Sequence, residues 1–261
     1  MVSFKLSSVI ALALAGSALN INAAAVGKRD GAAIDKRPSY TGVKAVDNCQ
    51  SFTDNFDPNT DLHQHWEKMN NASTYSLTSD GLEMKILNPR GSGLGPGSLF
   101  SSKRLMQYGF IEAKMKSAPA GGLVTAFIFM SPNGDEIDWE WVGDEVQTAY
   151  YYQGIPDFSS ADAKALKDQS TNYHTYGIDW QPDAITWYLD GEVYRKVTKE
   201  STYKDGEYHY PSEAAHVELG LWDASGSEST AAWAHGPINW SEHPDHVSAH
   251  VKYVKVDCYS S

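Results

Sequence analysis

The sequence predicts an all-β protein built as a sandwich of two antiparallel sheets. Three observations favour this class. Most periodic segments alternate apolar and polar residues, turn signals separate these segments, and almost none has the composition of a helix. The stretch from Cys49 to Cys258, roughly 210 residues, is long enough for one such domain. We therefore expect a single sandwich domain over residues 49–258.

The first predicted strands are joined by short turns. Ser79-Asp80-Gly81 is a turn signal between two short alternating runs, and Asn88 to Ser98 is a glycine-rich loop. Residues 109–116 alternate apolar and charged side chains, which is typical of a strand with one buried face. Residues 123–130 are continuously apolar and predict a strand buried on both faces. The first four strands are expected at residues 75–77, 82–86, 109–116 and 123–130.

The second half continues the pattern. Asp190-Gly191 between two β-rich runs predicts a tight hairpin. Only Ala161 to Lys167 has helical composition, and it lies in a connection. The remaining strands are expected at residues 134–143, 146–153, 174–180, 184–189, 192–194, 216–222 and 248–257.

The amino-terminal residues have the composition of a secretion signal. A lysine, a short apolar run and a small-residue cleavage site follow one another within residues 1–25, and the run is too short to span a bilayer. Residues 26–48 carry two dibasic pairs and are expected to be a propeptide or linker. No apolar segment ends the chain, so no lipid or membrane anchor is expected. We predict a secreted protein of the extracellular space or cell wall.

Charge limits the classes of partner. The chain has a net charge of −12, and residues 1–37 contribute +3, which leaves −15 on the remainder. A body this acidic repels nucleic acid and anionic lipid, so neither is an expected partner. A neutral polysaccharide suits it, and the protein is expected to act as a monomer.

The two cysteines, Cys49 and Cys258, lie at the two ends of the predicted domain. In an oxidising compartment a bridge between them would close a very long loop. The alternative is two unrelated thiols. Asn71 and Asn239 begin glycosylation sequons, which agree with export but also arise by chance.

The segment Gly134 to Gly143 carries acids at every second position. On a strand, Glu136, Asp138 and Glu140 share one face and large apolar residues share the other. Three neighbouring acids repel one another and gain nothing from packing, so this face indicates chemistry. The alternatives are a solvated strand face or a calcium site, although calcium prefers ligands from several loops.

The acids suit cleavage of a glycosidic bond, which needs two carboxyl groups at one anomeric carbon, ~5–5.5 Å apart when configuration is retained. Glu136 and Glu140 stand ~13 Å apart along a flat strand, so the sheet must curve and the side chains lean inward. Negative neighbours raise the pKa of Glu140, which keeps it protonated as an acid. Glu136 is the candidate nucleophile, and Asp138 can hydrogen-bond it.

On these residues the chain resembles glycoside hydrolase family 16. The framework runs Tyr108 to Lys114, Tyr173 to Trp180 and Trp187 to Gly191 stand in the family's order. The resemblance implies a concanavalin-like curved β-jelly-roll with a catalytic groove on its concave face. It implies Glu136 as nucleophile, Asp138 as its helper and Glu140 as acid/base.

Within the family, Asp135 to Trp141 and the later Trp222 and Trp233 resemble the fungal Crh-type cell-wall enzymes. The chain departs from their pattern at His235, where glycine is usual, and at Ala149, where asparagine is common. No chitin-binding module is expected. The resemblance implies a retaining glycosidase or transglycosylase acting on cell-wall β-glucan, chitin or both.

Four further residues are candidates for substrate contact. Trp222 and Trp233 stand among glycines and serines that favour a loop edge, where an indole can stack on a sugar, although tryptophans are more often core. Gln147 and Tyr151 occupy alternate positions of the next strand, where they line the cleft or merely pair across the sheet.

No organic cofactor and no metal ligand set is expected, and a structural calcium ion is left open. Two other functions remain. One is a β-1,3(1,4)-glucanase of the same family, which would differ in its cleft loops. The other is a lectin-like wall-binding protein that has lost turnover.

Overall fold

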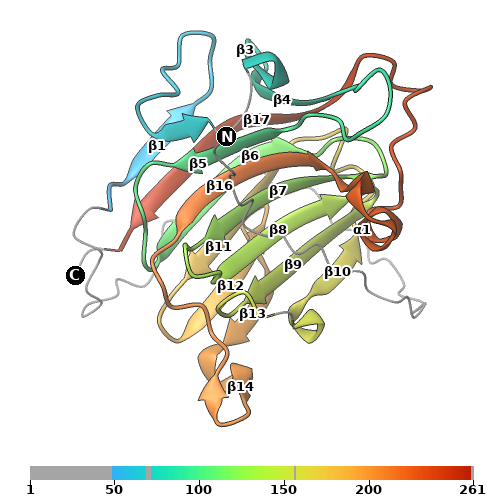
Figure 1. Cartoon of the computed structure of the whole chain (residues 1–261). Coiled ribbons are helices and arrows are strands. Elements are labelled where there is room, and N and C mark those ends of the chain that lie inside the picture. Colours follow the sequence, from blue (N-terminus) through green and yellow to red (C-terminus); the bar gives the residue numbers. More distant parts are fainter. Residues whose placement is uncertain (1–48, 69–71, 156, 260–261) are drawn as a thin grey trace, which may run out of the picture.

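The computed structural model describes residues 49–68, 72–155 and 157–259 and consists of two stacked antiparallel sheets (Figure 1). The predicted signal peptide, the predicted linker and Asn71 lie outside these residues. The front sheet has seven strands: β2 (Trp66–Lys68), β5 (Ser98–Ser102), β7 (Leu123–Met130), β8 (Glu136–Val142), β9 (Glu145–Tyr151), β10 (Asp162–Ala165) and β16 (His216–Asp223). They lie in the order β10-β9-β8-β7-β16-β5-β2.

The back sheet has eight strands: β1 (Phe52–Asn55), β3 (Tyr75–Thr78), β4 (Gly81–Leu87), β6 (Gly109–Lys116), β11 (His174–Trp180), β12 (Ala184–Leu189), β13 (Glu192–Thr198) and β17 (His246–Cys258). Its order is β13-β12-β11-β6-β17-β4-β3, and β1 also pairs with β17. A two-stranded ribbon, β14 (Tyr203–Lys204) with β15 (Glu207–Tyr208), projects from one end of the molecule (Figure 1). Short helices are η1 (Ala72–Thr74), η2 (Phe158–Ser160), η3 (Lys199–Thr202), η4 (Ala224–Gly226) and α1 (Glu228–Trp233). The predicted all-β jelly-roll sandwich of two antiparallel sheets is confirmed.

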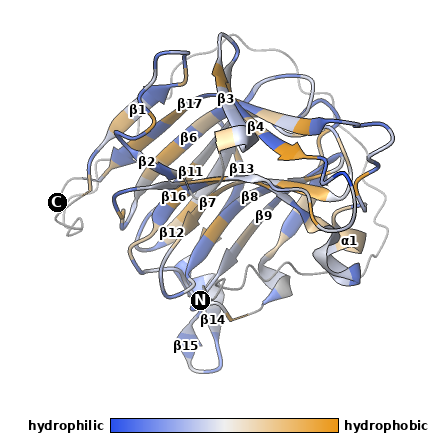
Figure 2. Cartoon of the chain, turned by 45° about the horizontal axis from the view of Figure 1, so that its top comes forward, coloured by the Kyte–Doolittle hydropathy of each residue, from blue (hydrophilic) through white to orange (hydrophobic). Residues whose placement is uncertain are grey.

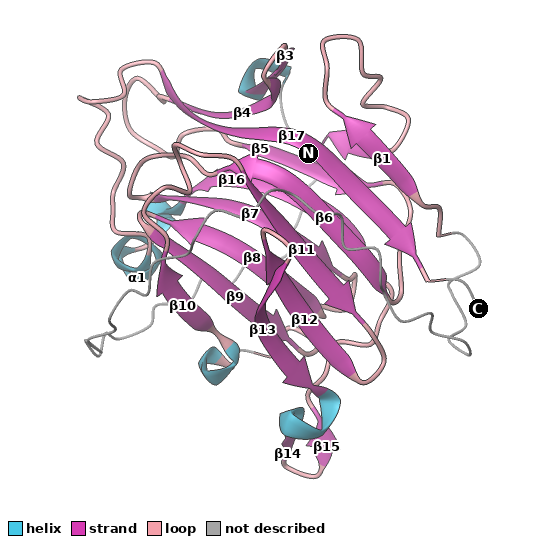
Figure 3. Cartoon of the chain, turned by 180° about the vertical axis from the view of Figure 1, so that it is seen from behind, coloured by secondary structure: helices cyan, strands magenta, loops and turns pink. Residues whose placement is uncertain are grey.

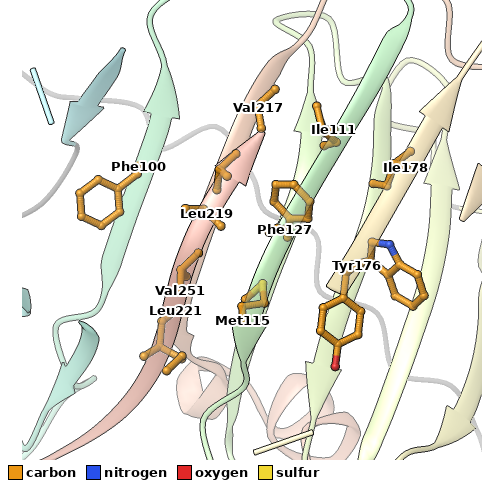
Figure 4. Packing of buried hydrophobic residues seen from close by; sticks show 14 of the residues in the cluster. Phe100, Ile111, Met115, Phe127, Tyr176, Ile178, Val217, Leu219, Leu221 and Val251 are labelled. Atoms are coloured by element: carbon orange, nitrogen blue, oxygen red, sulfur yellow. The ribbon is translucent and has the colours of Figure 1, made fainter. Parts of the chain in front are cut away.

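The core fills the space between the sheets. Hydrophilic and hydrophobic residues alternate along many strands (Figure 2), because successive side chains point to opposite faces. Apolar side chains from strands of both sheets meet in this layer, as Figure 4 shows for Phe127 of the front sheet and Ile111 of the back sheet. β7 is the exception predicted from its continuous apolar run, since all but its last residue are buried.

Tryptophan side chains tie β8 to the back sheet. The indole nitrogen of Trp139 on β8 donates to the carbonyl of Gly177 at 3.0 Å. In the opposite direction, the indole nitrogen of Trp187 on β12 donates to the carbonyl of Asp138 at 2.9 Å. Both bonds are buried, where an unpaired carbonyl would be costly. They fix the position of β8 relative to the back sheet. Figure 3 shows the back sheet from behind.

The two ends of the domain are joined covalently. Cys49 and Cys258 form a disulfide with their Cα atoms 6.1 Å apart and a sequence separation of 209 residues. β1 pairs with β17 immediately beside this bridge. The predicted disulfide is confirmed.

The Asp190-Gly191 hairpin is also confirmed. It joins β12 and β13, and both turn residues have positive φ, 49° and 83°. A two-residue turn of this kind suits the twist of the flanking strands.

Residues 161–167 do not form the helix that their composition favours. Residues 162–165 form β10, which pairs with the edge of the front sheet at β9. Arg195 of β13 donates to the backbone carbonyls of Thr148 on β9 (2.8 Å) and Ser160 (2.7 Å), just before β10. These tertiary hydrogen bonds outweigh the weak preference of alanine and lysine for helix.

Candidate active site

The three acids of β8 lie on the face of the front sheet that points away from the core. Between them, Ile137, Trp139 and Trp141 are at most 1% exposed within the core. Because alternate side chains take opposite faces, Glu136, Asp138 and Glu140 share the outer face, as the sequence predicted. The row is therefore built by the same alternation that builds the core.

This outer face is shielded from solvent beside the acids. Opposite Asp138 lie Ile128 of β7 and Ala149 of β9, and opposite Glu140 lies Ala126 of β7. These three side chains are only 9%, 3% and 6% exposed, although they point away from the core. The acids therefore stand on a small apolar floor, shielded from bulk water.

Burial dominates the electrostatics of the acids. It raises the pKa of Glu136 from an ordinary 4.5 to about 7 and that of Glu140 to about 8. For Glu140, the negative charge of Glu136 adds to the effect. Burial also raises the pKa of Asp138 well above its usual range, and the charges of Glu136 and Glu140 raise it further. The three groups thus interact as one cluster.

Asp138 and Glu136 interact directly. Contact between the two carboxyls lowers the pKa of Glu136 and raises that of Asp138. Among the described residues, no donor group reaches either carboxyl oxygen of Asp138. A hydrogen bond from a protonated Asp138 would favour the ionised form of Glu136, which a nucleophile requires.

The start of β8 is fixed by Asp135, which is buried. Its carboxylate accepts hydrogen bonds from the backbone amides of Gln153 (2.8 Å), Ser212 (2.7 Å) and Glu213 (2.9 Å). Gly134, just before it, has a φ of 92°, and a Cβ there would lie 2.7 Å from the amide nitrogen of Gly154. The loops around the Glu136 end of the strand are thus held to one another.

Gln147 and Tyr151 lie where the sequence placed them. In the ladder between β8 and β9, Gln147 is opposite Glu140 and Tyr151 is opposite Glu136. Gln147 is 5% exposed, and its side-chain oxygen accepts a hydrogen bond from the indole of Trp233 at 3.1 Å. Burial raises the pKa of Tyr151, and the charge of Asp138 adds to it. Both side chains border the acids, and contact with substrate stays a prediction.

Trp222 and Trp233 form a stacked pair beyond Glu140. Their rings lie 6.2 Å apart at 29°. Both are half-buried and pack on a small apolar cluster of Val124, Val142, Ala224 and Ala234. Trp233 ends α1, a short helix where a loop was expected. The pair is anchored by packing and keeps exposed ring surface, so stacking on a sugar stays a prediction.

A recess of about 370 Å³ lies past the Glu140 end of the strand. His235 and Glu145 line it, with 3.7 Å between the imidazole and the carboxylate. Glu145 also accepts a hydrogen bond from Gln147 at 3.3 Å, so this recess adjoins the row of acids.

Sequence reasoning missed Glu218. It lies on β16, on the same outer face, in line with Asp138 across β7. The alternation of residues 216–222 would have put it on one face, but no sequence signal placed β16 near β8.

Two other predictions concern surface and metal chemistry. Asn239 is exposed, and its glycosylation stays a prediction. Among the residues that the structure describes, no three His, Cys, Asp or Glu side chains gather to hold a metal ion. Within the same residues, no helix is long and apolar enough to cross a membrane. The expectation of no organic cofactor, with structural calcium left open, stays a prediction.

A family model described as glycosyl hydrolases family 16 matches residues 49–242. The chain belongs to this family. It is 39% identical to Crh-like protein 2 of Aspergillus fumigatus over 201 residues, which cover 72% of this chain and 44% of that protein. It is 32% identical to Congo red hypersensitive protein 2 of Saccharomyces cerevisiae over 248 residues, 85% of this chain and 51% of that one.

This family 16 chain spans about half the length of the curated relatives it matches. Among solved structures, apo Crh5 transglycosylase superposes with a TM-score of 0.70 and 27% identity, over 81% of this chain and 85% of that one. The same enzyme in complex with NAG gives a TM-score of 0.70 and 26% identity over the same shares. The resemblance to family 16 and to its Crh-like members is confirmed.

Proposed function

We propose that this protein is a retaining glycosidase or transglycosylase that acts on β-linked cell-wall polysaccharide. The observation that carries the proposal is the row of Glu136, Asp138 and Glu140 on one shielded face, where burial raises the pKa of each carboxyl. The relatives named Crh-like protein and Crh5 transglycosylase support the same chemistry.

In the first step, a carboxylate oxygen of Glu136 attacks the anomeric carbon while the bond to the leaving sugar breaks. Glu140 gives its proton to the leaving oxygen, and Asp138 keeps its hydrogen bond to Glu136. A pKa of about 8 keeps Glu140 protonated at neutral pH. The product of this step is an ester between Glu136 and the sugar.

In the second step, Glu140 acts as a base. The ester has removed the negative charge of Glu136, which had raised the pKa of Glu140, so Glu140 releases a proton more readily than before. It takes a proton from water or from a sugar hydroxyl, whose oxygen attacks the anomeric carbon and frees Glu136. Water gives hydrolysis, and a sugar hydroxyl gives transfer.

The substrate class follows from charge and from one relative. A domain this acidic suits an uncharged polymer. The Crh5 complex holds NAG, which favours chitin as one donor, and β-glucan is the other candidate. We propose a secreted protein that works at the cell wall as a monomer without an organic cofactor.

Chitin oligomers and β-1,3-glucan oligomers, each supplied with a fluorescently labelled acceptor sugar, test the proposal. Labelled products longer than the acceptor would demonstrate transfer, and shortened oligomers alone would demonstrate hydrolysis. The Glu136→Gln variant is the control and should give neither. If the parent were as inactive as this variant on both oligomers, a wall-binding lectin-like protein would replace the enzyme.

A further inference from the structure

β16 carries a second line of side chains on the outer face, parallel to the line of acids on β8. On β16, Val217, Leu219 and Leu221 point into the core between the sheets (Figure 4). The alternate residues His216, Glu218 and Trp222 therefore lie on the outer face with the acids. β16 is separated from β8 by β7 alone, so the two lines lie about 10 Å apart.

The floor between the two lines is apolar. Across β7, Ile128 lies between Asp138 and Glu218, and Ala126 lies between Glu140 and Gly220. A Cβ added at Gly220 would meet Ala126 at 3.7 Å and Leu99 at 3.8 Å, which is ordinary contact. Packing does not require glycine here. Gly220 therefore leaves a gap in the line of side chains between Glu218 and Trp222.

Glu218 stands half-buried at the side of this floor. The hydroxyl of Ser101 donates to its carboxyl, and the neighbouring His216 lies close enough to interact with its charge. His216 is itself held by a 2.6 Å hydrogen bond between its Nδ1 and the carbonyl of Ser102. A carboxylate has about four acceptor positions, so the bond from Ser101 leaves others available to a ligand.

We propose that Glu218 binds the sugar unit that lies over Ile128 and Gly220, by accepting hydrogen bonds from its hydroxyl or acetamido N–H groups. An uncharged pyranose carries donors on adjacent carbons, and a half-buried carboxylate can accept two of them with strong, charge-assisted bonds. The apolar floor suits the ring face. The proposal rests on the proposed function and adds a binding residue to it.

Because Glu218 is half-buried, its ionised carboxylate is destabilised when too few donors hydrogen-bond to it. Burial raises the pKa of Glu218 above its ordinary value, although the bond from Ser101 lowers it. The negative charge of Glu218 in turn raises the pKa of Glu136. Bound sugar donors would stabilise the ionised form of Glu218. Glu218 therefore links the occupancy of this position to the ionisation of the nucleophile.

Binding is tested in the Glu136→Gln background, which has no turnover. Calorimetric titration with chitotetraose and with laminaritetraose compares this protein with versions that also carry Glu218→Gln or Glu218→Ala. We expect at least one oligomer to bind about tenfold more weakly after Glu218→Ala and less severely after Glu218→Gln, because buried sugar donors lose an acceptor. Glu67→Gln is the matched control, since Glu67 lies in the same cross-strand row at the far edge of the sheet.

Unchanged affinity for both oligomers in both Glu218 variants would overturn the proposal, and so would the absence of binding to the Glu136→Gln protein. Circular dichroism establishes that each variant is folded. Weakened binding beside an inactive parent would reject the proposed enzyme and keep Glu218 as a sugar-binding residue. In an active parent, Glu218→Gln should also move the acidic limb of the kcat/KM profile to lower pH. Glu67→Gln should leave that limb in place.

Discussion

Replacement of Glu136 by glutamine should stabilise the protein at alkaline pH and leave its stability at acidic pH nearly unchanged. Glutamine has the shape of the protonated acid and never ionises. Burial disfavours the charged form of Glu136, so the folded protein binds this proton more tightly than the unfolded chain does. The substitution removes this difference in proton binding between the folded and unfolded states.

The sign follows from proton linkage. Between pH 4.5 and about 7, the unfolded chain has lost the proton of Glu136 while the folded protein retains it. Unfolding then releases a proton, so stability falls as pH rises. The pKa of about 7 compares with 4.5 for an ordinary glutamate, and one pH unit corresponds to 1.36 kcal/mol. The parent should therefore lose about 3 kcal/mol by pH 8 through this group.

Guanidinium unfolding followed by tryptophan fluorescence measures the effect at pH 4.5 and pH 8. We expect Glu136→Gln to match the parent at pH 4.5 and to exceed it by about 3 kcal/mol at pH 8. The charge of Glu136 also raises the pKa values of Asp138 and Glu140. Its removal lets these two groups ionise more easily in the folded protein, which adds to the gain in stability. Glu67→Gln removes an exposed charge from the same sheet and should show no such pH dependence. An equal difference between variant and parent at both pH values would contradict a raised pKa of Glu136 in the folded protein.

Two further predictions concern the framework. Replacing Cys49 and Cys258 by serine should lower the free energy of unfolding by about 5 kcal/mol, because the bridge closes a loop of 209 residues; a loss below about 1 kcal/mol in guanidinium unfolding would contradict this. Trp187→Phe leaves the buried carbonyl of Asp138 without its donor and should cost about 1–3 kcal/mol, with a fall in kcat. Trp66→Phe breaks a buried bond to the Asp54 carboxyl at edge strand β2 and should cost comparable stability without lowering kcat per folded molecule. Equal kcat values in the two variants would show that Trp187 does not position the catalytic strand.

Local chemistry made much of the fold predictable. Asp190-Gly191 supplies the two positive φ values that a tight hairpin needs, so the turn could be placed from two residues. The alternation of Glu136, Asp138 and Glu140 with large apolar residues fixed which side chains share a face. Both inferences depend only on neighbours in the sequence.

Long-range pairing limited the rest. Residues 162–165 have helical composition, but the open edge of β9 and the hydrogen bonds of Arg195 make them a strand. Glu218 reaches the acids only because β16 pairs with β7, about 90 residues earlier in the chain. No periodicity within one segment encodes that neighbour. The shared face of the three acids was therefore predictable, while the position of Glu218 across β7 from them was not.

The central claim is that Glu136 and Glu140 act on one anomeric carbon through an ester to Glu136. A slowly hydrolysed 2-deoxy-2-fluoro glycosyl substrate, followed by mass spectrometry of proteolytic fragments, tests it most directly. We expect a sugar adduct on the peptide that contains Glu136. We also expect NMR to show that the first-formed products retain the anomeric configuration of the substrate. Inverted products, or an adduct on any other residue, would contradict it.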